Sequence, residues 1–238
     1  MNKITFFCFP YAGGSGSIFH EWKKPLSANF DLKPIHYAGR GKRFNEPCYN
    51  DMDEAVTDIY KLISSQLDDN DYMFFGHSMG GLIAYEVCRK LIENGYKPPL
   101  HMFISGIKPP DMIRMRKIHN LPDSKFRKEL KKLNGTPREV FENKQLMDIF
   151  IPILRSDFKL IEEYKFKSIN SKITSNITVM YGAEDNMTRE ELMRWSDFTT
   201  EKTQIYRFQG GHFFINDKFF EVIDYINQKI IRGEDYYE

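Results

Sequence analysis

The chain has few of the features that mark secreted, membrane-spanning or nucleic-acid-binding proteins. Its three cysteines, Cys8, Cys48 and Cys88, are odd in number and widely spaced over 238 residues. This pattern predicts neither a disulfide framework nor a metal site, and it favours a reducing compartment. The formal net charge is only +1, which argues against nucleic acid or an anionic membrane as the main partner.

Long hydrophobic runs are also missing, since none approaches the ~20 apolar residues of a membrane span. The apolar stretch near the start, residues 4–9, is short for a signal peptide and ends at Pro10. We therefore predict a first strand there and a cytoplasmic protein. A hydrophobic content of 41% and an aromatic content of 15% are sufficient for a globular core.

Short apolar runs alternate with helical patterns, which predicts an α/β fold with a mostly parallel central sheet flanked by helices. Pro34 lies in the second apolar run and cannot donate to a strand ladder, so that run is expected at a sheet edge. The expected strands are 4–9, 31–37, 72–75, 101–106, 177–182 and 204–208, and the expected helices are 18–26, 51–67, the segment from about 79 to Gly95, 189–198 and 218–230.

The alternation fails between about residues 109 and 171, where the sequence is charged and shows helical spacing only. We interpret residues 1–238 as a single α/β domain in which this segment, approximately 109–171, is a helical lid insertion over the active edge of the sheet. A small independent helical domain is the alternative.

The pattern "GHSMG", residues 76–80, matches the G-x-S-x-G nucleophile elbow between a strand and a helix. A strand that turns directly into a helix strains the serine backbone and leaves no room for a Cβ on the flanking glycines. Ser78 is therefore the candidate nucleophile. A serine needs a positioned base that is oriented by an acid, in the chain order serine, acid, histidine.

His212 is the candidate base, because it lies in a glycine loop directly after the expected strand 204–208. For the acid, Asp185 is favoured, since its strand is expected beside the histidine strand. Asp111, after an earlier strand, and Glu184 remain open. Two backbone N–H groups are needed for an oxyanion, and the candidates are Met79, which follows the nucleophile, and Ala12 in the early glycine-rich turn.

The assembled pattern resembles the type II thioesterases, stand-alone α/β-hydrolases that accompany nonribosomal peptide and polyketide synthetases. The elbow is shared with many esterases, and the remaining markers are more specific. They are "CFPYAGGS" from Cys8, "AGRGKR" from Ala38, "LNGTP" from Leu133, "PILRSDF" from Pro152, "YGAED" and "GGHFF". One mild departure is Ala38, where the family often has proline.

The resemblance implies a Ser78–Asp185–His212 triad with Met79 and Ala12 as oxyanion donors, no cofactor and no metal. It implies as substrate an acyl group on the phosphopantetheine arm of a carrier protein, and a monomeric enzyme that removes misloaded or stalled intermediates. Arg40, Lys42 and Arg43 are candidate contacts for the arm or the carrier. A general carboxylesterase or lipase, a non-catalytic carrier-binding protein and an acyl transferase remain alternatives.

Overall fold

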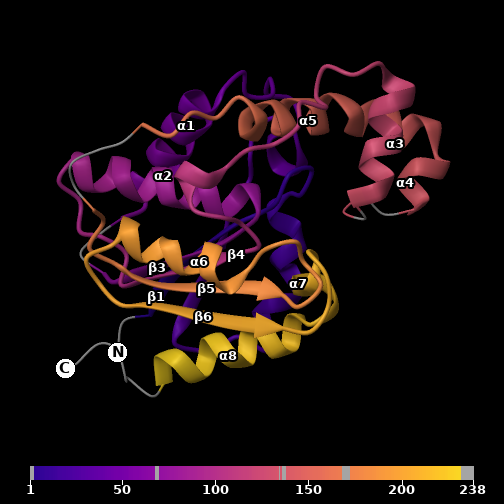
Figure 1. Ribbon diagram of the computed structural model, residues 1–238. Helices are drawn as coiled ribbons and strands as arrows, with labels where there is room; N and C mark the ends of the chain where they lie inside the picture. The colour runs from indigo at the N-terminus through magenta and orange to yellow at the C-terminus, as the bar shows by residue number, and fades with distance from the viewer. Residues whose placement is uncertain (1–2, 68–69, 134, 136–137, 168–171, 232–238) are drawn as a thin grey trace.

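The computed structural model describes residues 3–67, 70–133, 135, 138–167 and 172–231. Six strands form one sheet in the order β2-β1-β3-β4-β5-β6, and all of the neighbouring strands are parallel (Figure 1). The strands are β1 (Ile4–Phe9), β2 (Phe30–Pro34), β3 (Tyr72–His77), β4 (His101–Ser105), β5 (Asn176–Gly182) and β6 (Thr203–Phe208). The α/β fold is confirmed, as is the edge position of the strand that carries Pro34.

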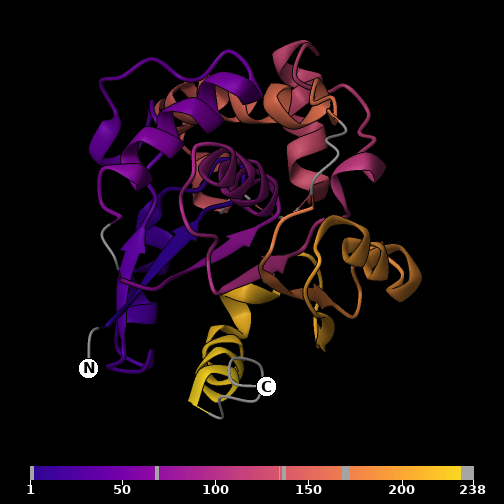
Figure 2. The ribbon, with the colours of Figure 1, turned by 90° about the vertical axis from the view of Figure 1, so that its left-hand side faces the viewer.

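Side chains of the sheet alternate between two apolar layers, as the two-residue period of a strand requires. In β1, Phe7 and Phe9 pack under α1 (Met52–Ser64) and α2 (Met79–Glu93). Phe6 and Cys8 face the other way, toward α8 (Phe219–Ile231) and the 3-10 helix η1 (Gly16–Lys23). Figure 2 shows these helices on opposite sides of the twisted sheet. The core is thus a three-layer sandwich around β1, β3, β4 and β5.

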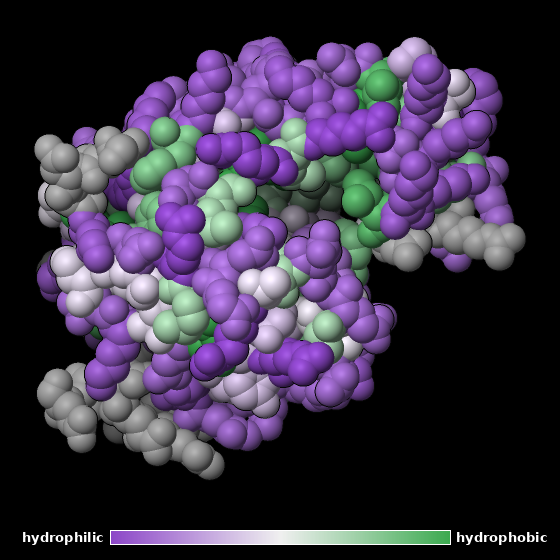
Figure 3. All heavy atoms as spheres, in the orientation of Figure 1, coloured by the Kyte–Doolittle hydropathy of each residue, from purple (hydrophilic) through white to green (hydrophobic). Residues whose placement is uncertain are grey.

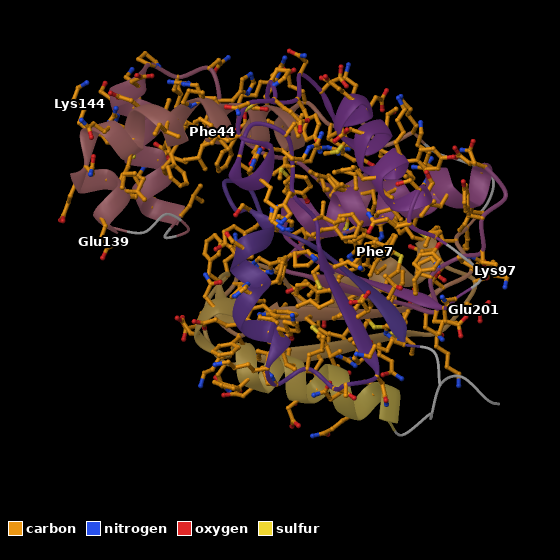
Figure 4. All side chains as sticks on the ribbon, turned by 180° about the vertical axis from the view of Figure 1, so that it is seen from behind. Phe7, Phe44, Lys97, Glu139, Lys144 and Glu201 are labelled. Atoms are coloured by element: carbon orange, nitrogen blue, oxygen red, sulfur yellow. The ribbon has the colours of Figure 1, made fainter. Side chains whose placement is uncertain are left out.

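The segment between β4 and β5 is helical where it is described, as expected. It contains η3 (Pro110–Met112), α3 (Asp123–Leu133), α4 (Arg138–Glu142) and α5 (Lys144–Glu162). These helices have a small apolar core of their own, which includes Phe126, Leu130, Leu154 and Phe158. From behind, Glu139 and Lys144 lie on the outer side of this insertion, far from Phe7 in the sheet (Figure 4).

Several local predictions need adjustment. Part of the expected lid, at residues 134, 136–137 and 168–171, lies outside the described residues, and so does most of "LNGTP". The helix expected at 18–26 is the 3-10 helix η1, and the helix expected at 189–198 divides into α6 (Arg189–Met193) and η4 (Arg194–Phe198). The short helix α7 (Phe214–Asp217) was not expected.

The expected end of α2 is confirmed, since Gly95 follows it at a φ of +81°, as a helix-terminating glycine does. In the described part of the chain, no helix has the length and apolar character to cross a membrane.

A buried histidine makes the stability of this sheet depend on pH. His101 of β4 stacks on Phe103, its Nε2 lies 2.8 Å from the Thr178 hydroxyl, and burial lowers its pKa from 6.5 to about 3. Between these two pH values the unfolded chain binds a proton that the folded chain does not. Acidification from pH 7 should therefore reduce the free energy of unfolding, through His101, by up to ~1.4 kcal/mol per pH unit below about 6.5.

Urea unfolding of the wild type and of His101→Leu at pH 7 and at about pH 4.5 checks this dependence. The variant loses a constant amount of stability but should have a shallower pH dependence, by about 2–3 kcal/mol over this interval. His20→Leu, at an exposed position, is the control and should retain the wild-type slope. Parallel curves for His101→Leu and wild type would contradict the prediction.

Candidate active site

Ser78 occupies the strained turn that the elbow pattern predicts. It joins β3 to α2 with φ 53° and ψ −121°, and no other non-glycine residue among those described has a positive φ. The Ser78 N–H donates to the Ser105 carbonyl of β4 at 2.7 Å, and the Gly81 N–H donates to the Ser78 carbonyl at 2.9 Å. These bonds hold the serine at the carboxyl edge of the sheet and at the amino end of α2.

The glycines on either side of the elbow are required by close backbone packing. A Cβ on Gly76 would lie 2.4 Å from the Gly80 carbonyl oxygen, and a Cβ on Gly80 would lie 2.2 Å from the Phe9 carbonyl oxygen. Both separations are far inside van der Waals contact, and backbone atoms cannot move aside cheaply. The elbow is therefore pressed against the end of β1, which brings the first glycine-rich turn next to the nucleophile.

A cavity of about 850 Å³ opens at this edge of the sheet, and Figure 3 shows a hollow with apolar side chains between the insertion and the sheet. Ser78, Asp185 and His212 lie in its wall. The insertion and the loop before it supply apolar lining from Met112, Ile113, Leu130, Leu133, Leu154, Phe158 and Ile161. The cavity can therefore hold an apolar chain beside a hydroxyl nucleophile.

His212 and Asp185 form the acid–base contact that the strand order implies. β5 and β6 are adjacent and parallel, so the loops that follow them meet, and His212 Nδ1 lies 2.7 Å from Asp185 Oδ2. A Cβ on Gly182 would lie 2.3 Å from the Gly211 carbonyl oxygen, which shows how closely the two loops approach. Donation from Nδ1 to the carboxylate leaves Nε2 as the proton acceptor.

No hydrogen bond within the described part of the chain joins the Ser78 hydroxyl to His212, although both side chains line the same cavity. Catalytic hydrogen bonds of this kind are commonly long in the absence of substrate. The described geometry therefore has His212 and Asp185 already in contact, with Ser78 in the wall of the same cavity.

Neither rival acid forms a hydrogen bond with His212 in the described structure. Asp111, in η3, accepts a hydrogen bond from Arg194 of η4 at 2.5 Å. Glu184 also lines the cavity, but its side chain is exposed and no hydrogen bond from it to His212 is found in the described structure. Of the three carboxylates, Asp185 is the one that contacts the histidine.

His77 is next to Ser78 in sequence but faces the interior of the sheet. It is fully buried, and its Nδ1 lies 2.8 Å from the Ser105 hydroxyl. Burial, and secondarily the neighbouring His212, lowers the pKa of His77 well below 6.5. His77 is therefore neutral at physiological pH and packs beneath His212, with the two ring centroids 5.0 Å apart.

The two predicted oxyanion donors come from two different segments of the chain. Met79 is the first residue of α2, where backbone N–H groups have no partner within the helix. Ala12 lies in the turn from Tyr11 to Gly14 and lines the cavity. Within the described structure, neither N–H donates a hydrogen bond. Both are free to bind a ligand oxygen, and their role in catalysis stays a prediction.

Of the three predicted carrier or arm contacts, Arg40 requires a correction, whereas Lys42 and Arg43 stay predictions. Arg40 is only 3% exposed and pairs with the fully buried Asp157 of α5, so it cannot contact a carrier surface. Arg43 bonds to Glu46 and Asp58, whereas Lys42 is exposed. Sequence reasoning missed Asp157 as a functional candidate, although a lone acid on the apolar face of α5 is a signal for a buried partner.

The comparisons with known proteins agree on one family. A model described as a thioesterase domain matches residues 5–230. The crystal structure of ClbQ from the colibactin NRPS/PKS pathway aligns with a TM-score of 0.93 and 39% identity, covering 98% of this chain and 99% of that one. The type II thioesterase BorB from the borrelidin biosynthetic cluster aligns with a TM-score of 0.85 and 27% identity, over 95% and 92% of the two chains.

A relative from Brevibacillus parabrevis, LgrE, is 34% identical over 221 residues, which cover 91% of this chain and 83% of LgrE. Its name describes a linear gramicidin dehydrogenase. The glycines of the present chain nowhere follow the G-x-G-x-x-G spacing of a dinucleotide site. A dehydrogenase function therefore has no support from the sequence of this chain.

Proposed function

The chain belongs to the thioesterase domain family, and from this premise we propose that it hydrolyses acyl thioesters on the phosphopantetheine arm of carrier proteins. The carriers are those of nonribosomal peptide or polyketide synthetases, since ClbQ comes from the colibactin NRPS/PKS pathway. Removal of misloaded or stalled acyl groups restores the free thiol of the arm. A type II thioesterase of this kind acts as a separate enzyme beside the synthetase.

The observation that carries the proposal is the joint position of Ser78 and the His212–Asp185 pair in one apolar-walled cavity. An acyl chain occupies the space under the insertion, and its thioester carbonyl lies above Ser78. The N–H groups of Met79 and Ala12 stabilise the oxyanion that develops on attack. The chain is a thioester hydrolase, and the Ser–His–Asp mechanism is the route we propose for it.

The reaction proceeds through an acyl-enzyme. His212 Nε2 takes the proton of the Ser78 hydroxyl as its oxygen attacks the thioester carbon. The tetrahedral intermediate collapses, the carbon–sulfur bond breaks, and His212 gives the proton to the departing pantetheine sulfur. Water then attacks the ester carbonyl and loses its proton to His212. Collapse returns that proton to the Ser78 oxygen and releases the carboxylic acid.

Three cationic side chains at the cavity wall would favour binding of the anionic phosphopantetheine arm. Lys108, Arg114 and Lys132 are lining residues. Lys108 pairs with Glu191 at 2.6 Å and Lys132 with Glu129 at 2.9 Å, while Arg114 is exposed. A phosphodiester entering from solvent meets positive charge on its way to the apolar interior, which favours its approach.

The wild-type enzyme is expected to release the acid from acyl-phosphopantetheinyl carrier protein with a higher kcat/KM than from an oxygen ester of the same acyl group. Thiols leave readily, and an oxygen ester lacks the arm and the carrier. Mass spectrometry of the carrier, with and without enzyme, measures loss of the acyl group and recovery of the thiol. Efficient cleavage of the oxygen ester with no change in the acyl-carrier would replace this assignment by a general esterase.

A further inference from the structure

A buried ion pair crosses from the loop after β2 to the helical insertion. Arg40 is 3% exposed and Asp157 of α5 is fully buried, and the two groups form a bidentate contact in which Arg40 Nη2 lies 2.6 Å from Asp157 Oδ1. Burial opposes the charge of Arg40, but the neighbouring carboxylate outweighs it and raises the guanidinium pKa. Removing two charges from water costs free energy that their mutual attraction can fail to offset. Stability alone therefore does not account for an ion pair buried this deeply.

The same pair holds the turn that carries Ala12. The Gly13 N–H donates to Asp157 Oδ2 at 2.7 Å, and Arg40 Nη1 donates to the Gly14 carbonyl at 3.4 Å. The Gly14 N–H bonds to the Tyr11 carbonyl at 2.9 Å and Gly13 has a φ of +78°, the pattern of a type II turn. In such a turn the central peptide supplies the Gly13 N–H, and Asp157 fixes its direction.

α5 also packs against this turn through an apolar side chain. A Cβ on Gly13 would lie 2.6 Å from Leu154 Cδ2, and Leu154 precedes Asp157 by three residues, so both lie on one face of the helix. The Ser156 hydroxyl donates to the Tyr49 carbonyl at 2.7 Å, a second polar anchor of α5 to the loop after β2. The insertion and the turn are therefore joined as one unit at the edge of the cavity.

We propose that Arg40 and Asp157 are positioning residues for the proposed thioester hydrolysis: Asp157 holds the Gly13 N–H, and thereby keeps the adjacent Ala12 N–H aimed at the oxyanion. Arg40 orients the carboxylate and neutralises it. This inference rests on the proposed function, and it adds that the insertion sets the geometry of the transition state as well as the shape of the cavity. A displacement of about 1 Å in a positioned group lowers rates by about 10²-fold.

The test uses a substitution that removes the pair without leaving an unpaired buried charge. In Arg40→Met/Asp157→Leu, apolar groups of similar size replace both partners, and such replacements commonly preserve stability. We expect a folded enzyme whose kcat on a small acyl thioester, acyl-N-acetylcysteamine, is lower by about 10–100-fold, with little change in KM. A loss confined to kcat indicates an interaction made in the transition state.

A second variant tests whether loss of the hydrogen bond from the Gly13 N–H to Asp157 causes the decrease in kcat. Arg40→Met/Asp157→Asn keeps an acceptor oxygen but no charge, and it should recover most of the lost kcat. The matched control is Glu86→Leu/Arg89→Met, which removes another largely buried pair, with side chains 15% and 9% exposed, outside the cavity lining. This control should retain wild-type kcat, and thermal unfolding of all variants reports their stability.

The inference is overturned if Arg40→Met/Asp157→Leu has wild-type kcat, if the control loses as much, or if the asparagine variant shows no recovery. A separate measurement is the rate at which a fluorophosphonate labels Ser78, because its tetrahedral adduct also places an oxygen at the oxyanion donors. Wild type that is labelled but cleaves no thioester would refute the proposed function. The ratio of labelling rates between variant and wild type would then still test the positioning role.

Discussion

Ser78→Ala and His212→Ala are each expected to lower kcat for acyl-thioester hydrolysis by about 10⁴–10⁶-fold. The first removes the nucleophile, and the second removes the base whose Nδ1 is already bonded to Asp185 at 2.7 Å. Because the two groups act as a unit, the double variant should be no slower than either single one. Release of the free carrier thiol, followed with a thiol reagent under single-turnover conditions, measures the effect.

Two exposed residues provide matched controls for these substitutions. Ser17→Ala and His20→Ala change the same residue types in η1, outside the cavity lining, and should retain wild-type kcat. Thermal unfolding should show that Ser78→Ala is folded. Residual turnover within about tenfold of wild type in Ser78→Ala would exclude an acyl-serine mechanism, and with it the proposed triad.

Asp185→Asn should cost about 10³–10⁴-fold in kcat, since an amide cannot hold the imidazole in the required tautomer or stabilise the imidazolium. Asp111→Asn is the matched substitution at the rival carboxylate. It breaks only the partly exposed pair with Arg194, and such pairs contribute about 0.2–1 kcal/mol to stability. Its kcat should therefore stay close to that of wild type.

The comparison of these two variants identifies the acid directly. Initial rates at saturating substrate, measured over a range of pH, separate a loss of kcat from a shift in the pH profile. A large loss in Asp111→Asn with near-normal activity in Asp185→Asn would reverse the assignment. Similar losses in both would show that the Asp111–Arg194 contact also positions the loop that carries the histidine.

Much of the overall fold could be predicted from local sequence patterns. Strand β1 coincides with the apolar run at residues 4–9, and the edge position of β2 follows from the missing N–H of Pro34. The elbow was recognisable because G-x-S-x-G encodes a steric requirement that each residue satisfies locally, and the φ of 53° at Ser78 bears this out. α7 was missed because four residues are too short for a helical period to be detected.

The loop at residues 40–43 shows where local reasoning fails. Three cations in four residues suggested a solvated or ligand-binding surface, but Arg40 is buried against Asp157, which lies 117 positions later in the chain. No sequence period connects these two residues, because the contact depends on how α5 of the insertion packs over the first turn. Burial of a charge is decided by its partner, and the partner is supplied by the tertiary fold.

The sequence by itself therefore determined the α/β class, the strained serine and the order of serine, acid and histidine, because each depends on neighbouring residues or on the order of the strands. The expected strand order favoured Asp185, but only the tertiary structure showed which of the three carboxylates contacts His212, and it alone brought Asp157 to Gly13. Both outcomes depend on distances between segments far apart in the chain, which hydrophobic periodicity and turn chemistry do not specify. The elbow depends on steric requirements of neighbouring residues. The groups around it, by contrast, come together only when the sheet and the insertion pack against each other.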